Sequence, residues 1–201
     1  MNITVIGATG MIGSRVVAEA ARRGHTVTAI SRAGTAVAGA TKAQAAELAD
    51  TPVIVGAVNG SDATVIAVPP DRTGGSHDSY LQAHRDLIAA QPNGRMLVVG
   101  GAGSLEVDGV QLKDTPGFPA IYYKEAATLS DVLDAYRASK GLAWTFLSPA
   151  PMIAPGERSG RYRLGSDNPI GDSISAEDFA VAVVDELEKS AHAGRRFTVA
   201  N

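Results

Sequence analysis

Three glycines near the start of the chain have the spacing of a phosphate-binding turn. Gly7, Gly10 and Gly13 directly follow the apolar run Ile3–Ile6, and apolar residues at helical spacing begin at Ile12. In such a strand–turn–helix unit, the first glycine permits the tight turn and the second lets a pyrophosphate approach the backbone. The third lets the helix pack on its strand. The helix N-terminus then offers unpaired N–H groups and a partial positive charge to the phosphates.

The glycine motif therefore predicts a dinucleotide site, and an ordinary turn between a strand and a helix is the alternative. The residues expected to contact the dinucleotide are Gly7, Thr9, Gly10, Met11, Ile12 and Gly13. The second apolar run ends in Ser31 and Arg32, where an acidic residue would accept bonds from the ribose hydroxyls and repel a 2′-phosphate. Because arginine binds phosphate bidentately and stacks on adenine, this pair predicts a preference for NADPH over NADH. A solvated surface arginine is the alternative.

Other polar side chains lie in loops that follow strands. Arg72 and His77 belong to a loop that could border a substrate, although an exposed loop residue is the favoured interpretation for His77. Arg158, Arg161 and Arg163 form a basic cluster further along the chain. The cluster could attract an anionic substrate or could simply alternate charges on a surface hairpin.

The elements that must position these residues follow the order of a doubly wound parallel sheet, because apolar runs alternate with helical segments. The runs are Ile3–Ile6, Val27–Ile30, Thr64–Val68, Met96–Val99, Trp144–Leu147 and Phe197–Val199, with an alanine-rich strand at Thr41–Ala46. Helices are expected over Asp78–Ala90, Tyr122–Ser139 and Ala176–Lys189, with a short one from Pro52 to Asn59. We predict a single Rossmann-like α/β domain over residues 1–201, with about seven strands. Loops after strands, at 100–119 and 149–172, should form the ligand crevice.

Composition narrows the class of protein. A chain of 201 residues with net charge −3 suits one domain and gives no reason to expect a nucleic acid or an anionic membrane as partner. The absence of cysteine excludes disulfides and thiolate sites, and the four histidines lack metal-ligand spacing. The N-terminus lacks the pattern of a signal peptide. We expect a cytoplasmic monomer or homodimer that acts on a small-molecule substrate and carries no metal.

Several segments resemble the atypical branch of the short-chain dehydrogenase/reductase superfamily. They are the glycine spacing, the Ser31-Arg32 pair, the Glu47–Asp50 turn, Val98–Ser104 and Leu142–Pro149. Within that branch the chain is most similar to small NAD(P)H-binding proteins that include biliverdin-IXβ reductases, NADH-flavin reductase-like proteins and NmrA-like regulators. The resemblance implies a Rossmann-like fold and an NADP site, but it does not identify a substrate.

The resemblance also implies cofactor contacts at matching positions. Glu47 stands where an aspartate usually caps the adenine, and Leu48 packs beside it. The other implied contacts are Ala67, Val68 and Pro69 under the adenosine ribose, Gly100 and Gly101 near the nicotinamide, and Pro149, Ala150 and Met152 over its carboxamide. The chain departs from the family pattern at two of these positions, since Glu47 replaces the usual aspartate and Pro69 has no backbone N–H to donate.

The proton donor of the superfamily is a Tyr-x-x-x-Lys pair at the start of the helix that precedes strand Trp144–Leu147. This start reads Tyr122-Tyr123-Lys124, and four residues after either tyrosine the chain has alanine. The lysine of the pair is therefore absent, and the candidate catalytic residues are Tyr122, Tyr123 and Lys124. The literal string from Tyr136 to Lys140 lies at the far end of the helix, and we interpret it as a coincidence on an exposed helix face.

Without that pair, reduction of a ketone lacks its usual acid. A flavin or another conjugated ring needs less help, because it delocalises charge and solvent can supply the proton. The sequence therefore favours an NADPH-dependent reductase with a small conjugated acceptor such as FMN or FAD. The alternative is an NmrA-like sensor that binds NADP(H) without turnover. A sugar epimerase or dehydratase is disfavoured by the missing pair and by the small C-terminal part.

Overall fold

The main sheet has eight strands in the order β10-β12-β8-β5-β4-β1-β2-β3. In this computed structural model, which describes residues 1–201, seven of the strands are parallel and only β10 is antiparallel to its neighbour. Their bounds are β1 Asn2–Ile6, β2 Thr26–Ser31, β3 Lys42–Ala45, β4 Ala63–Ile66, β5 Met96–Val99, β8 Trp144–Pro149, β10 Arg163–Gly165 and β12 Arg195–Ala200. The predicted single-domain Rossmann-like fold is confirmed.

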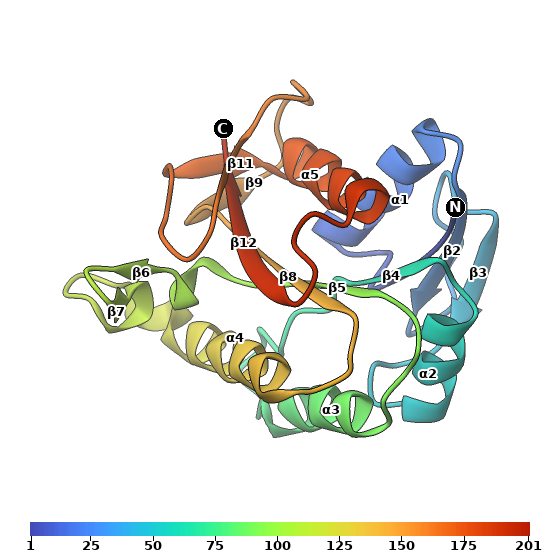
Figure 1. The fold of residues 1–201 in the computed structure, drawn as a ribbon, viewed down its shortest axis with the longest axis horizontal. Helices are drawn as coiled ribbons and strands as arrows, with labels where there is room; N and C mark the ends of the chain where they lie inside the picture. The colour runs from blue at the N-terminus through green and yellow to red at the C-terminus, as the bar shows by residue number, and fades with distance from the viewer.

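Helices cover both faces of this sheet (Figure 1). One layer consists of α1 (Met11–Arg22) and α5 (Ala176–Lys189), which pack against each other. The other consists of α2 (Thr51–Asn59), α3 (Asp78–Ala89) and α4 (Ala120–Ala138). Each layer encloses its own hydrophobic cluster against the strands. None of the helices is long and apolar enough to cross a membrane.

The loops that follow β5 and β8 carry small elements that the sequence did not predict. After β5 come a 3-10 turn at Ala102–Ser104, the hairpin of β6 (Glu106–Val107) and β7 (Val110–Gln111), and a second 3-10 turn at Leu112–Asp114. After β8, strand β9 (Met152–Ala154) pairs with β11 (Ser173–Ser175). The eighth strand of the main sheet, β10, was also missed. It is a three-residue edge strand without an apolar run, so periodicity does not reveal it.

The predicted elements lie where expected, with small shifts at their ends. The alanine-rich run forms edge strand β3, and α5 has the predicted bounds. Ser175 caps α5, since its hydroxyl accepts a hydrogen bond from the Asp178 N–H at 3.0 Å. Asp50 occupies the N-cap position of helix α2 without a side-chain capping bond, because its carboxylate accepts from the Glu47 N–H at 3.0 Å. Pro52 lies in the first turn of this helix, and Gly60 ends it. The chain passes from β3 across to β4 on the other side of β1, so the strand order reverses between β1 and β4. Ligands of doubly wound folds bind at such a crevice, outside the carboxyl ends of the strands.

Candidate cofactor site

The glycine turn joins β1 to α1 at this switch point, and two of its glycines are required by the fold itself. Gly7 has a φ of +83°, and a Cβ there would lie 2.6 Å from the Ala67 carbonyl oxygen at the end of β4. A Cβ on Gly13 would overlap the Gly7 carbonyl. The Gly7 N–H donates to the Ile30 carbonyl at 2.9 Å, which fixes the turn against the end of β2. Glycine is therefore needed at both positions whether or not a ligand is present.

Gly10 differs from the other two glycines. Its φ of −74° suits any residue, and an added Cβ would meet only the Gly7 carbonyl oxygen at 3.2 Å and the Ala67 carbonyl oxygen at 4.0 Å. A side chain here therefore requires a shift of a few tenths of an ångström at the Gly7 carbonyl, which is far less than a Cβ on Gly7 or Gly13 would require. Because Gly10 has no Cβ, the space next to its backbone is open, and a pyrophosphate can approach the backbone closely there.

The N-terminus of α1 is bare. Gly10 is the N-cap and provides no side-chain acceptor, and the first turn has no acidic residue. Ser14 is the first residue of the helix whose N–H is bonded, to the Gly10 carbonyl at 3.0 Å, and no hydrogen bond within the protein uses the N–H of Met11, Ile12 or Gly13. Three unpaired donors and the positive end of the helix dipole therefore converge on one point, which is the arrangement that binds phosphate groups.

The residues implied for the nicotinamide end lie at the same edge of the sheet. Gly100 donates its N–H to Leu147 of β8, and a Cβ on Gly100 would overlap the Phe146 ring. A Cβ on Gly101 would lie only 2.9 Å from the Leu129 side chain of α4. Ala150 is buried and donates its N–H to Val199 at 3.0 Å. These residues shape a floor of backbone and small side chains.

Three further residues implied for the cofactor are exposed or partly exposed around this floor. Val68 is partly buried, Pro69 is exposed, and Met152 in β9 is 68% exposed. Pro149 is buried at the end of β8. These residues and the two glycines lie at the ends of β4, β5 and β8, which are the next three strands on one side of β1, the strand that leads into α1.

At the adenosine end, Ser31 and Arg32 lie at and just beyond the end of β2. The Ser31 hydroxyl is buried and accepts a hydrogen bond from the Thr35 N–H at 3.1 Å. The Arg32 side chain is exposed and forms no hydrogen bond or ion pair within the protein, so its guanidinium is free for an anion. Glu47 is also exposed, whereas Leu48 is buried in the core under this turn and supports it.

The candidate catalytic residues lie in the first turn of α4. Tyr122 is 56% exposed and its hydroxyl has no hydrogen-bond partner, and the Tyr123 hydroxyl lies 3.5 Å from Asp114. The Lys113 ammonium lies 5.9 Å from the centre of the Tyr123 ring. The Lys124 ammonium donates to the Gly75 carbonyl at 2.5 Å, so it holds the loop that follows β4.

The same loop is fastened to α4 by two other contacts. Arg72 donates two hydrogen bonds to the Glu125 carboxylate at 2.9 and 2.6 Å, and this pairing raises the pKa of the guanidinium. His77 is buried, contrary to the prediction of an exposed loop residue. Its ring lies 2.8 Å from the Thr128 hydroxyl and 2.7 Å from the Asp71 carbonyl. Those partners retain the imidazole inside the protein, and Thr128 is too distant in sequence to be identified from it.

The interpretation of the Tyr136–Lys140 string as an exposed pair is wrong for the tyrosine. Tyr136 is fully buried between α3, α4 and β8, with its hydroxyl 3.2 Å from the ring of His84. Burial raises the pKa of this hydroxyl above its ordinary value. Lys140 is exposed and lies beyond the end of α4. A tyrosine with no exposed surface cannot reach a substrate, so the string does not provide a catalytic pair.

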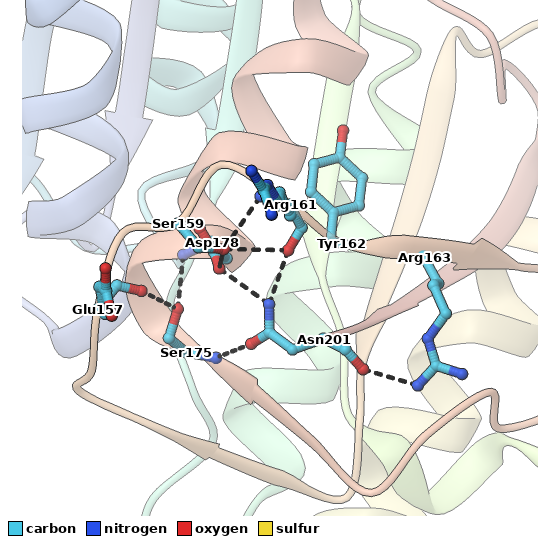
Figure 2. A pocket seen from close by; sticks show the side chains of 8 residues that line it. All are labelled: Glu157, Ser159, Arg161, Tyr162, Arg163, Ser175, Asp178 and Asn201. Carbon is cyan, nitrogen blue, oxygen red and sulfur yellow. Dashed lines mark hydrogen bonds between the residues drawn. The ribbon is translucent and has the colours of Figure 1, made fainter.

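Two arginines of the basic cluster after β9 are engaged within the protein, whereas the Arg161 side chain is exposed and forms no hydrogen bond or ion pair. Arg158 binds the buried Glu19 of α1 at 2.8 and 3.0 Å, and Arg163 donates to the Asn201 carbonyl at 2.6 Å. In Figure 2, Asp178 lies between Ser159 and Asn201 and accepts hydrogen bonds from both side chains. The Asp178 carboxylate also accepts a hydrogen bond from the Gly160 N–H at 2.7 Å. These contacts explain the cluster as a folded loop fastened to α1 and α5, which sequence spacing alone did not reveal.

Comparison with known proteins agrees with this geometry. The profile of a family described as NAD(P)H-binding matches residues 7–190. YwnB of Bacillus subtilis, an uncharacterised protein, is 39% identical over 99% of this chain and 98% of its own length. A proposed exported protein of Burkholderia pseudomallei is 42% identical over the whole of both chains, with a TM-score of 0.89. A proposed NADH-flavin reductase of Streptococcus pneumoniae is 34% identical over 100% of this chain and 99% of its own, with a TM-score of 0.86.

Proposed function

This chain belongs to the NAD(P)H-binding family, and from that premise we propose that it is an NADPH-dependent reductase whose acceptor is a small conjugated molecule such as a flavin. The observation that carries the proposal is the bare N-terminus of α1. The N–H groups of Met11–Gly13 are unpaired and directly follow Gly10, at the switch point of the sheet. A Cβ on Gly10 would meet only one tight contact, with the Gly7 carbonyl oxygen, so the fold alone does not account for glycine there.

The choice of NADPH rests on Arg32. Its guanidinium is exposed and unpaired at the end of β2, next to the Ser31 backbone, where an acidic residue would select NADH. A 2′-phosphate placed there would gain a charge-assisted, bidentate contact. The Glu47 carboxylate lies after β3 and is exposed, so it is accessible for the contact with the adenine that the family resemblance implies.

The choice of acceptor rests on the first turn of α4. When bound, the nicotinamide supplies a hydride, so the protein must place an acceptor and allow a proton to reach it. Tyr122 and Tyr123 present exposed aromatic rings, which suit stacking on a flat ring system. Neither tyrosine has a lysine one turn later, and Lys124 is engaged with the Gly75 carbonyl. This arrangement suits an acceptor whose reduced form takes its proton from solvent.

The relative from Streptococcus pneumoniae, described as a proposed NADH-flavin reductase, supports the same acceptor class. The protein's contribution to rate would be orientation of acceptor over cofactor. Steady-state oxidation of NADPH, measured with FMN, FAD, quinones and tetrapyrroles, tests the proposal. Turnover with at least one flavin, with a higher kcat/KM for NADPH than for NADH, is the expected result. Tight NADPH binding with no turnover on any acceptor would overturn the reductase and favour a sensor.

A further inference from the structure

Two segments implied in cofactor binding are joined by a residue that belongs to neither. Glu177, in the first turn of α5, accepts a hydrogen bond from the Gly156 N–H at 2.7 Å through one carboxylate oxygen. Its other oxygen accepts from the Arg15 side chain at 2.6 Å. Arg15 in turn donates to the Met11 carbonyl at 2.8 Å, in the first turn of α1. One carboxylate therefore links the loop after β9 to the start of the phosphate-binding helix.

The two ends of this link have different positions in the site. Met11 follows Gly10 and contributes one of the unpaired N–H groups of the α1 N-terminus. Gly156 follows β9, the strand that carries Met152 and continues from the buried Pro149 and Ala150. A ligand that spans the α1 N-terminus and the end of β8 must contact both segments at once. If the folded protein already holds these two segments in their bound positions, less free energy is lost in ordering them when the ligand binds.

The charges favour this link in the absence of ligand. Burial on its own would raise the pKa of the Glu177 carboxyl, but the hydrogen bonds from Gly156 and Arg15 outweigh it and hold the pKa below its usual range. The carboxylate also lies at the positive end of the α5 dipole. Arg15 and Gly156 are both far from Glu177 in sequence. Their hydrogen bonds to Glu177 therefore fix the positions of α1 and of the loop after β9 relative to α5, in addition to stabilising α5 itself.

We propose that Glu177 is a positioning residue for the dinucleotide, which fixes the loop after β9 against the first turn of α1 through Arg15 and Gly156. The proposal rests on the proposed function, since it assumes that the dinucleotide occupies this edge of the sheet. Loss of the carboxylate should weaken NADPH binding without removing any group that contacts the cofactor. The loss should be graded, because glutamine still accepts from Gly156 but no longer pairs its charge with Arg15, whereas alanine does neither.

The chain offers a matched control at the other end of the same helix pair. Glu188 near the end of α5 pairs with Arg23 at 2.8 Å and lies 2.8 Å from the ring of His25, so it also makes two contacts with the α1 region. Glu188→Ala should therefore cost comparable stability while leaving the cofactor edge intact. Isothermal titration with NADPH and thermal unfolding are measured for the unmutated protein, Glu177→Gln, Glu177→Ala and Glu188→Ala.

We expect Glu177→Ala to weaken NADPH binding about tenfold, consistent with the loss of a charge-assisted contact, and Glu177→Gln to weaken it less. Glu188→Ala should bind as tightly as the unmutated protein. Equal affinities for the Glu177 and Glu188 variants would overturn the positioning role, as would unchanged affinity in Glu177→Ala. If Glu177→Ala fails to fold, the comparison of Glu177→Gln with Glu188→Gln decides in the same way. Failure of the unmutated protein to bind either NADPH or NADH would instead refute the proposed function.

Discussion

Gly10 gives the sharpest test of the cofactor site, because the fold does not require glycine there and the ligand does. Replacement by alanine adds a Cβ at an ordinary φ of −74°, with its nearest neighbour, the Gly7 carbonyl oxygen, at 3.2 Å. Alanine at a compatible position stabilises by about 0.4–1 kcal/mol through the unfolded chain, which offsets this slightly tight contact. We therefore expect Gly10→Ala to shift the Tm by less than about 4 °C in either direction. Gly10→Val adds a branched three-carbon side chain in the space that a pyrophosphate would occupy.

Binding should respond very differently from stability. A side chain at Gly10 would separate the phosphates from the N–H groups of Met11 and Ile12, which have no other partners. Hydrogen bonds to a charged group contribute about 1.5–3 kcal/mol each, so the loss of two weakens binding by roughly a hundredfold or more. Titration calorimetry with NADPH, together with thermal unfolding, measures both quantities. Gly13→Ala is the opposite control, because its Cβ would overlap the Gly7 carbonyl and should destabilise the fold itself.

Two results would refute this reasoning. Unchanged NADPH affinity in a folded Gly10→Val variant would show that the pyrophosphate does not approach this turn. A large loss of stability in Gly10→Ala, comparable with that of Gly13→Ala, would show that the fold needs Gly10 for reasons of its own. In that second case weak binding by the variants would carry no information on the ligand.

Three further outcomes follow from the structure. Arg32→Ala should weaken NADPH binding about ten- to a hundredfold and leave NADH binding unchanged, and calorimetric titration with both cofactors checks this; equal affinities in the unmutated protein would contradict the assignment. The double variant Tyr136→Phe with Lys140→Ala should have a free energy of unfolding lower by about 1–3 kcal/mol, because the ring of His84 loses its buried hydrogen-bond partner. Its turnover should change by less than about twofold. A hundredfold loss of turnover would restore a Tyr-Lys mechanism. Burial lowers the pKa of His84 from 6.5 to about 3, so the unfolded chain binds the extra proton between these values. Because of this group, the free energy of unfolding should fall by about 2 kcal/mol from its value above pH 6.5 to its value at pH 5. Thermal unfolding of His84→Gln at the same pH values should show a correspondingly weaker pH dependence.

The sequence predicted the fold well because its signals are local. Apart from the exposed edge strand β3, each parallel strand contains an apolar run that is largely buried, and segments with helical spacing recur between these runs. The cap of α5 is also local, since Ser175 and Asp178 are three residues apart. The glycine turn follows the same logic, because conformation and close packing at Gly7 and Gly13 depend on immediate neighbours and on the adjoining strand.

The errors concern contacts between residues far apart in the chain. His77 is buried because its ring reaches Thr128, fifty-one positions later, and nothing near His77 indicates this. Tyr136 is a different case, since Leu129, Leu133 and Tyr136 recur at intervals of three and four and form the buried face of α4. The helical spacing therefore contained the signal that places Tyr136 in the core.

The first turn of α4 connects the fold to the proposed chemistry. A lysine that assists a tyrosine must be free to lower the pKa of the phenol, but Lys124 donates to Gly75 and Arg72 is paired with Glu125. These two cations thus hold the loop after β4 against the helix, and Lys113, near the Tyr123 ring, is paired with Asp114. The tyrosines are left exposed and without a basic partner of the usual kind, so they can stack on an acceptor more readily than they can protonate it. Selection among acceptors would then depend on the shape and aromatic character of the acceptor and on the position of the loop after β4. This arrangement suits a reaction that needs no strong acid.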